Sequence, residues 1–326
     1  MTLHLAVLTL ALWQVEVSLA ELQGDAKEWL ERMIQATQTL NYEGTFVYVQ
    51  GQHLEAMHII HKGGMDGEQQ RMFSLSGSPR EVVVADNQVI CLLPKQKKSL
   101  GSNSGYQRSP FPISLPQELD ELEQNYRFKM FGKDRVAGMK TQVIAIQPRD
   151  NLRFGYKLWL EQETAMVLRS AILNESGHAL EQLMFTDWQV KPEVDQDLVS
   201  PPDIKTPMPS PASGENGQLE EQEPDWLFRE LPQGFKQVMY NRFTGASDKH
   251  LTEHIVLTDG LATVSVFLET LAGSPPLLKG AAQMGAMNAY GKVINKHQAL
   301  VVGEVPQATV EKIASALQPA QEVSTP

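Results

Sequence analysis

The sequence predicts a mainly β protein of two domains, a large one built on a broad antiparallel sheet and a small α+β one. Residues 131–190 hold successive strand-like runs separated by short polar turns, and no helical period interrupts them. Residues 199–225 are rich in proline and acidic side chains, which is typical of a linker between domains. The remaining chain carries hairpin signals and a single helical stripe, which favours a small sheet with one helix.

Length and charge narrow the classes of function. The chain has 326 residues, of which 42% are hydrophobic and 21% charged, enough to bury two ordinary cores. Its net charge of -11 argues against a nucleic acid as the main partner. We therefore expect a globular protein that does not bind nucleic acid.

The first 20 residues resemble a signal peptide. Leu3–Trp13 is an apolar run long enough for the core of such a peptide and too short to span a membrane. Ser18-Leu19-Ala20 fits the small-x-small pattern that precedes cleavage, so the mature chain is expected to begin at residue 21. The alternative is a buried first helix.

The first domain is expected to open with a helix. Asp25 and Glu28 have the spacing of a capping box, and an apolar stripe from Trp29 to Leu40 follows at helical spacing. Strands are expected over 44–49, 54–60, 70–75, 81–85 and 89–93, then a long excursion over 94–117 and a short helix over 118–125.

The meander that follows has apolar residues on both faces. Its strands are expected over 126–131, 141–147, 154–160, 165–173 and 179–190. In the fourth strand Met166 and Leu168 share one face while Val167 and Ala171 share the other. In an antiparallel sheet with one solvated face, apolar and polar side chains alternate more cleanly. We therefore expect both faces to contact either other parts of the chain or a ligand. One would take the first helix and the 94–125 segment, and the other would be open or lined by a ligand.

The second domain is expected over residues 226–318. Strands are predicted over 235–241, 252–258, 261–269, 289–294 and 300–305, with a hairpin turn at Asp259-Gly260. Val310, Ile313, Ala314 and Leu317 share a helical face before Pro319.

The chain offers little for catalysis. His250 to His254 matches the H-x-x-E-H pattern of some zinc peptidases, but the match runs into a strand, where residues four apart lie about 13 Å from one another. Cys91 is the only cysteine, so no internal disulfide can form, and a buried inert thiol is expected. We expect no enzyme activity, no cofactor and no metal.

Two groups of residues are candidates for binding, each with a second interpretation. The basic residues Arg127, Lys129, Arg135 and Arg153 lie at the entry to the meander. They indicate either an anionic head-group site or a sheet edge guarded by charge. The apolar residues Trp159, Met166 and Met184 indicate either a groove for lipid chains or ordinary core.

An ordered set of short segments resembles the MucB/RseB family. The segments are Leu40–Phe46, Pro79–Val83, the meander from Gly132 to Phe185, Leu231–Phe235, Thr258–Gly260 and Val302–Pro306. No single motif is specific, but the resemblance covers nearly the whole mature chain. It implies a periplasmic regulator of an envelope-stress sigma factor.

The resemblance carries expectations for each domain. Residues 21–198 would form an antiparallel half-barrel covered by helices, like that of lipoprotein carriers, and residues 226–318 would contact the periplasmic region of a membrane-bound anti-sigma factor. Trp226, Phe235 and Arg242 are the residues expected at that contact. Bound there, the protein would shield the anti-sigma factor from its first protease, and lipopolysaccharide or mislocalised lipoprotein acyl chains would release it.

Other interpretations remain at this stage. The main alternative is a periplasmic lipid or lipoprotein carrier without a regulatory partner, although a carrier needs only the half-barrel. An envelope hydrolase built on the H-x-x-E-H match is a third. A homo-oligomer is also left open.

Overall fold

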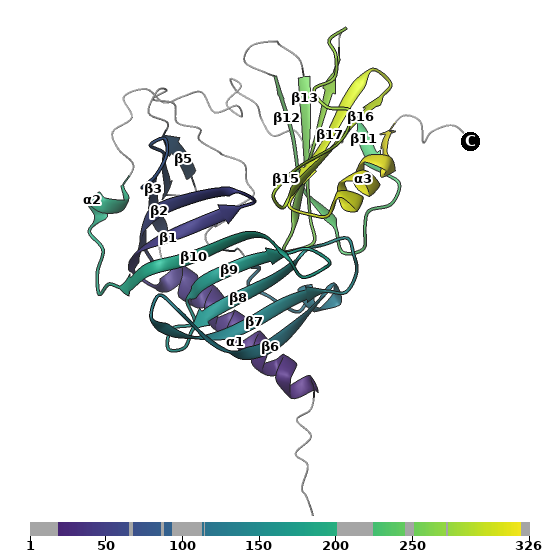
Figure 1. Ribbon diagram of the computed structural model, residues 1–326. Helices are drawn as coiled ribbons and strands as arrows, with labels where there is room; N and C mark the ends of the chain where they lie inside the picture. The colour runs from purple at the N-terminus through teal and green to yellow at the C-terminus, as the bar shows by residue number, and fades with distance from the viewer. Residues whose placement is uncertain are drawn as a thin grey trace, which may run out of the picture.

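Two antiparallel sheets, each with a helix on one face, make up the molecule (Figure 1). The computed structural model describes residues 19–64, 68–85, 88–92, 113, 115–200, 224–244, 251–271 and 273–320. Within these ranges no helix has both the length and the apolar character needed to cross a membrane. Residues 1–18 of the expected signal peptide, residues 86–87 between two expected strands, and most of the 94–117 excursion lie outside them.

The first domain is a ten-stranded sheet in the order β5-β4-β3-β2-β1-β10-β9-β8-β7-β6. Its strands are β1 (Tyr42–Gln50), β2 (His53–Lys62), β3 (Gln69–Ser74), β4 (Glu81–Ala85), β5 (Gln88–Leu92), β6 (Tyr126–Val136), β7 (Met139–Pro148), β8 (Gly155–Glu161), β9 (Val167–Leu173) and β10 (Ala179–Val190). Two meanders meet where β1 pairs with β10. The sheet curls strongly. Cα atoms of β6 and β10 lie within 8 Å of one another although three strands separate β6 from β10 in the sheet. The expected broad antiparallel sheet is confirmed.

One face of this sheet is covered by α1 (Leu19–Thr39). Leu30, Met33 and Ile34, all from the expected stripe, are buried against Phe128 and Leu158 of the sheet. The expected start at the Asp25 capping box is wrong, because the helix already runs from Leu19. Burial of the apolar stripe stabilises a helix of this length more than a cap does.

The segment before β6 completes the cover of the same face. Leu115, Leu119 and Leu122 are buried in the core with α1, and the expected short helix is a single turn, η1 (Leu122–Gln124). The predicted packing of the first helix and the 94–125 segment on one face is thus confirmed for residues 115–124. A short helix α2 (Gln196–Val199) ends the domain.

The second domain is a six-stranded sheet in the order β12-β13-β14-β17-β16-β15. Its elements are β11 (Trp226–Phe228), β12 (Lys236–Thr244), β13 (Leu251–Thr258), β14 (Thr263–Thr270), β15 (Gly280–Met284), β16 (Met287–Ile294), β17 (His297–Gly303), α3 (Gln307–Ala316) and β18 (Leu317–Pro319). The helix packs on one face through Val310, Ile313 and Ala314, as expected. The sequence did not predict β15 or the small β11-β18 pair.

Candidate functional site

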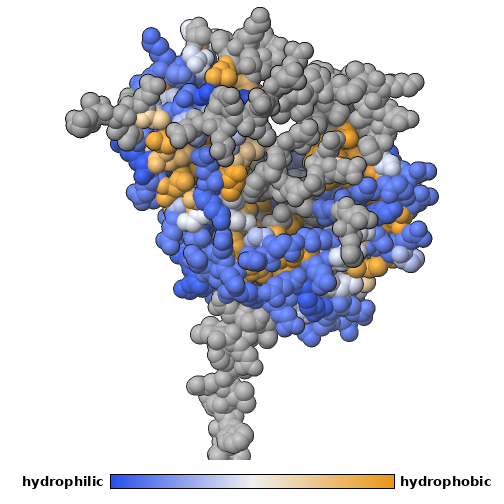
Figure 2. Space-filling view, turned by 180° about the vertical axis from the view of Figure 1, so that it is seen from behind, coloured by the Kyte–Doolittle hydropathy of each residue, from blue (hydrophilic) through white to orange (hydrophobic). Residues whose placement is uncertain are grey.

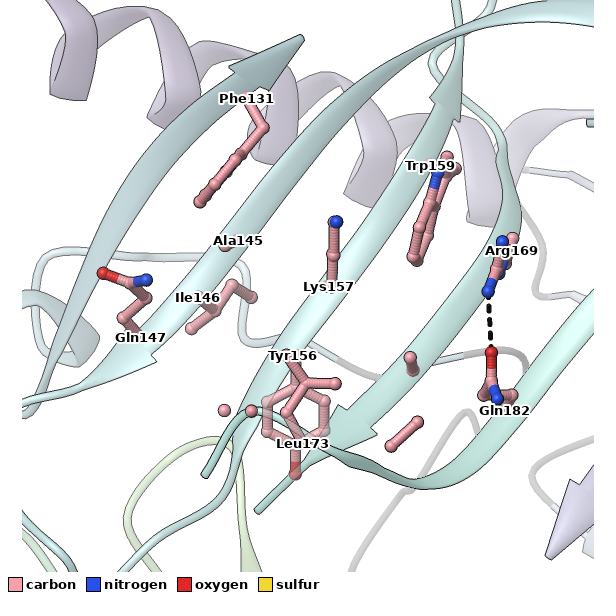
Figure 3. Close-up of a pocket in the computed structure, with 14 residues that line it drawn as sticks. Phe131, Ala145, Ile146, Gln147, Tyr156, Lys157, Trp159, Arg169, Leu173 and Gln182 are labelled. Atoms are coloured by element: carbon pink, nitrogen blue, oxygen red, sulfur yellow. Dashed lines mark hydrogen bonds between the residues drawn. The ribbon is translucent and has the colours of Figure 1, made fainter. Parts of the chain in front are cut away.

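A hollow of about 510 Å³ opens on the face of the first sheet opposite α1 (Figure 3). Side chains alternate between the faces of a strand, and residues such as Ile144 and Leu158 are buried beneath the sheet with α1. Their neighbours Ala145, Lys157 and Ala171 therefore reach the other face, where they line the hollow. The second face of the sheet, which the sequence predicts to be open or lined by a ligand, is thus open at this hollow.

The hollow forms because small residues make its floor. Ala145, Gly155, Ala171 and Ala179 come from four neighbouring strands and leave space that longer side chains would fill. Phe131, Lys157, Trp159 and Arg169 stand around this floor as walls, as Figure 3 shows. The result is a partly apolar trough with charged groups at its side.

A bulge places Phe131 over the hollow. The pairing of β6 with β7 shifts register between Met130 and Lys133. The buried amide of Gln142 donates to the Phe131 carbonyl at 2.6 Å, which satisfies a group that the bulge removes from the ladder. The Phe131 ring is 47% exposed, so it is open to a ligand.

Two cations share the aromatic wall. The Arg169 guanidinium lies 4.2 Å from the centroid of Trp159, and Lys157 Nζ lies 5.1 Å from Trp159 and 5.5 Å from Phe131. Arg169 also donates to the amide oxygen of Gln182 at 2.7 Å. No carboxylate of the described residues lies within ion-pair distance of either cation, although the charge of Asp134 interacts with both, so both cations remain placed to meet an anionic group.

Asp134 is the acidic neighbour of this wall. It accepts a hydrogen bond from Trp159 Nε1 at 2.8 Å, which fixes the indole ring. The backbone N–H of Arg135 and then this indole bond hold the pKa of the Asp134 carboxyl below its usual value. The carboxylate therefore stays ionised and positions the ring on which both cations lie.

The residues predicted for lipid or anion binding are not all brought together. Trp159 lines the hollow. Arg127 and Lys129 are exposed on β6, which is an edge strand, and Arg135 is exposed at the far end of the same strand. These positions fit the interpretation of a charge-guarded edge. Met184 is 36% exposed and pairs with Arg169, outside the lining.

Met166 and Arg153 require correction. Met166 is fully buried in the core of the curled sheet, because the turn after β8 folds it inward, so it cannot touch a ligand there. Arg153 is also fully buried, but in the junction between the two domains. Its charge is compensated by Asp150 and Asp259, so it offers no anion site.

Arg153 and Asp259 form the centre of that junction. Arg153 Nη1 donates to Asp259 Oδ2 at 2.6 Å, and both side chains are 0% exposed. The Tyr126 hydroxyl donates to the same oxygen at 2.8 Å. The other oxygen of Asp259 accepts the backbone N–H groups of Leu261 and Ala262 at 3.0 and 2.7 Å. The buried carboxylate is thus fully hydrogen-bonded, as burial of a charge requires.

Burial, and then the charge of Asp259, raise the pKa of Tyr126 well above its ordinary value. The tyrosine therefore remains a hydroxyl donor in the junction. Leu261, from the hairpin that Asp259 opens, is buried in the first domain's core with α1. A turn of the second domain thus closes part of the first core.

Phe235 belongs to the same junction. Its ring is buried and lies 5.3 Å from the Arg153 guanidinium, while Arg153 also donates to the Gln233 carbonyl. A side chain at Gly234 would clash with Asn125, so the loop can approach the first domain only with glycine there. Phe235 therefore does not lie on an open partner surface, contrary to the sequence-based expectation.

A second contact between the domains surrounds Glu181 of β10. Its Oε1 accepts the backbone N–H of Ala286 at 2.8 Å, from the β15-β16 turn, and the Gln50 amide at 2.8 Å. The Tyr48 hydroxyl donates to its other oxygen. Glu181 is 6% exposed, so this contact is also nearly dry.

The other residues expected to contact an anti-sigma factor belong to the second domain's own structure. Trp226 is buried in that domain's core at β11, 5.4 Å from the His297 ring, and this burial contradicts its role as a contact. Arg242 is partly exposed on the edge strand β12 and pairs with Asp225 and, at 3.7 Å, with Glu253. Of the three, Arg242 alone is placed where a partner can reach it.

Some site residues were missed in the sequence. Arg169 and Gln182 lie in strands whose alternation gave no sign of a hollow, and Asp259 was interpreted only as a turn residue. A signal was present for Arg169, because a lone cation in an otherwise apolar strand is unusual. Glu253 and His254 lie on β13, as expected, so the second half of the H-x-x-E-H match is a strand.

Family models match both domains. The model of the MucB/RseB N-terminal domain matches residues 25–203, and that of the MucB/RseB C-terminal domain matches residues 220–318. The chain belongs to the MucB/RseB family. The resemblance seen in the ordered segments is therefore confirmed.

Named relatives of the chain are sigma-factor regulatory proteins. The sigma factor AlgU regulatory protein MucB of Pseudomonas aeruginosa is 31% identical over 90% of this chain and 91% of that protein. The sigma-E factor regulatory protein RseB of Haemophilus influenzae is 28% identical over 95% of this chain and 96% of its own length. The RseB of Escherichia coli K12 is 25% identical over 87% and 88%.

Solved structures of MucB share the fold. MucB in a crystal structure with MucA(peri) is 27% identical, with a TM-score of 0.69, covering 90% of this chain and 99% of that one. MucB of the Pseudomonas aeruginosa MucA/MucB complex is 26% identical with a TM-score of 0.70 over the same shares. The predicted fold class and the predicted regulatory function are confirmed at the level of the family.

Proposed function

We propose that the chain restrains an envelope-stress sigma factor by binding the periplasmic region of its membrane-bound anti-sigma factor and shielding that region from proteolysis. The solved complex of the relative MucB with MucA(peri) is the observation that carries this proposal, because the chain matches that MucB over 90% of its length. A fold made of two docked sheets, with no metal-binding cluster among its described residues, is compatible with a binding protein. The apolar run at the start of the sequence supports export to the periplasm.

The hollow supplies the responsive element of this proposal. Its Lys157 and Arg169 have only the nearby Asp134 as an acidic neighbour and no carboxylate of the described residues at ion-pair distance, and Phe131 and Ala171 offer apolar contact beside them. This combination suits an amphiphile with an anionic head and an acyl chain, a chemistry that lipopolysaccharide and phospholipids share. On this proposal the bound amphiphile releases the anti-sigma factor.

A proteolysis assay tests the function. The mature chain would be mixed with the anti-sigma factor's periplasmic fragment and with the protease that makes the first cut. Cleavage should slow in proportion to the occupied fragment, and added lipid A should restore it. If saturating chain leaves cleavage unchanged, the shielding function is wrong. If lipid A fails to restore cleavage, the responsive half is wrong.

A charge-removal experiment tests the hollow. The double variant Lys157→Gln/Arg169→Gln should bind lipid A roughly tenfold or more weakly, because each lost charge-assisted hydrogen bond costs about 1.5 kcal/mol or more. The matched control is Lys279→Gln/Lys296→Gln, which removes the same charge from exposed sites of the second domain. Equal weakening by both variants would show a general charge effect and contradict a site at the hollow.

A lipid or lipoprotein carrier without a regulatory partner is the second candidate. The hollow favours it as much as it favours a sensor. The built junction with a second domain does not, because a carrier has no need of that domain. Affinity capture from envelope extract should therefore recover an anti-sigma factor, whereas a carrier would recover lipoproteins alone.

A further inference from the structure

Two hairpins of the first domain line the hollow and also hold the second domain. The β7-β8 connection carries Arg153 of the junction and, directly after it, Gly155 of the hollow. The β9-β10 hairpin carries Gly177 and Ala179 of the hollow and is followed by Glu181, which holds Ala286. Each hairpin therefore has one part at the hollow and another at the second domain.

Tyr156 connects the first pair of sites most directly. It borders the hollow from below (Figure 3), while its ring, on the α1 face of the sheet with Leu158, is buried in the same core cluster as Tyr126 and Leu261. Tyr126 donates to Asp259, and Leu261 is the second domain's own residue in that cluster. A shift of Tyr156 would therefore be felt by two residues that seat the second domain, since close-packed interiors transmit displacement.

Gln182 and Glu181 connect the second pair. They are consecutive on β10, so their side chains point to opposite faces. Gln182 accepts from Arg169 at the hollow, and Glu181 accepts from Ala286 of the second domain. An anionic group that takes the Arg169 guanidinium from Gln182 acts on the backbone that presents Glu181.

We propose that these two hairpins couple the hollow to the domain junction, so that an anionic amphiphile in the hollow loosens the Arg153–Asp259 and Glu181–Ala286 contacts. This rests on the proposed function and specifies its regulation. The docked arrangement binds the anti-sigma region, and the loosened one does not. By linkage, the amphiphile and the anti-sigma region then weaken each other's binding by the same factor.

The junction has the properties of an element with two states. A buried ion pair with complete hydrogen bonding is either formed or broken, because an intermediate separation leaves charges buried without partners. The exposed pair between Lys236 and Glu121 also spans the domains, at 2.9 Å, but water can replace it at little cost. The coupling is therefore assigned to the buried contacts and not to the exposed one.

The test measures the affinity of the full mature chain for the anti-sigma fragment with and without lysophosphatidylglycerol, an anionic amphiphile. Lysophosphatidylcholine, of the same chain length, is the zwitterionic control. Three chains would be compared: the unaltered protein, Asp259→Asn, and Glu121→Gln as a variant that removes a charge from the exposed pair of the same interface. In the unaltered protein the anionic amphiphile should weaken fragment binding about tenfold or more.

In Asp259→Asn the junction is already loosened, so the fragment should bind about tenfold more weakly than it binds the unaltered protein even without amphiphile. Adding the anionic amphiphile should then change the fragment affinity of this variant by a ratio of less than about twofold. Glu121→Gln should keep the full ratio. A folded Asp259→Asn protein that keeps the full ratio overturns the coupling and leaves the proposed function standing. If the anionic amphiphile leaves fragment binding to the unaltered protein unchanged, both the coupling and the responsive half of the proposed function are overturned, while the shielding function is not touched by that result.

A second variant covers failure of Asp259→Asn to fold. Thr309→Val removes only the hydroxyl that donates to the Leu152 carbonyl at 2.7 Å, a further bond between the domains beside Arg153. The factor by which the anionic amphiphile weakens fragment binding should be smaller in this variant than in the unaltered protein and larger than in Asp259→Asn. A Thr309→Val protein with the full ratio contradicts the proposal.

Discussion

Arg153 shows how far a single residue's role depends on its surroundings. In sequence it follows Arg149 among several other cations, so it was grouped with an exposed basic cluster. In the structure it is among the largest fully buried side chains of the described residues, held by Asp150, by Asp259 and by the ring of Phe235. The partner that decides its role lies 106 residues away, and no local pattern indicates that distance.

Removing the partner of this buried cation should be costly. Asp259→Ala leaves Arg153 without its buried carboxylate and Tyr126 without its acceptor. We expect the free energy of unfolding to fall by about 3–5 kcal/mol in urea denaturation. Glu121→Gln, at the exposed pair, should change it by less than about 1 kcal/mol. Equal effects of the two variants would contradict the burial of the junction.

His254 should make stability depend on pH. Its ring stacks on Phe267 at 4.3 Å, its buried Nε2 has no hydrogen-bond partner among the described residues, and burial lowers its pKa below the ordinary value near 6.5. The unfolded chain then binds a proton that the folded chain refuses. Stability should therefore be full above about pH 7 and fall as the pH drops through 6.5 toward the lower folded pKa.

The check compares unfolding free energies at pH 7.5 and pH 5.5. His254→Phe should reduce the loss between these values, whereas His53→Gln, at an exposed histidine, should keep it. The Glu43 carboxylate, whose pKa is lowered chiefly by its bond from Lys191, acts in a separate window below its ordinary value of 4.5. An unchanged loss in His254→Phe would refute the assignment.

At the scale of elements, strands with strong local signals were predictable and their neighbours were not. β4 was predicted to the residue, and the Asp259-Gly260 hairpin was placed correctly. β15 was not predicted, because its Gly-Ala-Ala-Gln-Met sequence has low strand propensity and is held by pairing with β16. The extension of β6 to Val136 depends on the Phe131 bulge, which alternation does not reveal.

The β15-β16 turn should tolerate no side chain at Gly285. An added Cβ would lie 2.5 Å from Gln50 Cγ and 2.6 Å from Glu181 Oε1, at a φ of 60°. Gly138→Ala is the matched control, because its φ of 81° imposes similar backbone strain while no atom of the described residues would lie within 4 Å of the added Cβ. Alanine at 138 should cost about 1 kcal/mol, and alanine at 285 about 1–3 kcal/mol more, by urea denaturation. Equal costs would show that the turn is not docked.

The whole molecule joins two sheets, each with a helix packed on one face. The proposed function depends on the surfaces that these helices do not cover. Viewed from behind, hydrophobic residues reach the described surface in several separate patches among hydrophilic ones (Figure 2). The two faces of the first sheet were predictable from its apolar pattern. The hollow was predictable only as an open face, since just Trp159 of the predicted binding residues lines it. Contacts between the domains depend on turns and glycines whose long-range partners the sequence does not reveal.

Calorimetric titration measures whether the chain binds the periplasmic region of the anti-sigma factor, on which the proposed function depends. The mature chain would be titrated with the periplasmic fragment of the anti-sigma factor encoded in the same genome. We expect saturable binding with a negative heat-capacity change, because apolar surface is buried on association. The proposed function would be contradicted if a correctly folded fragment gave no binding heat at several temperatures and did not co-elute with the chain.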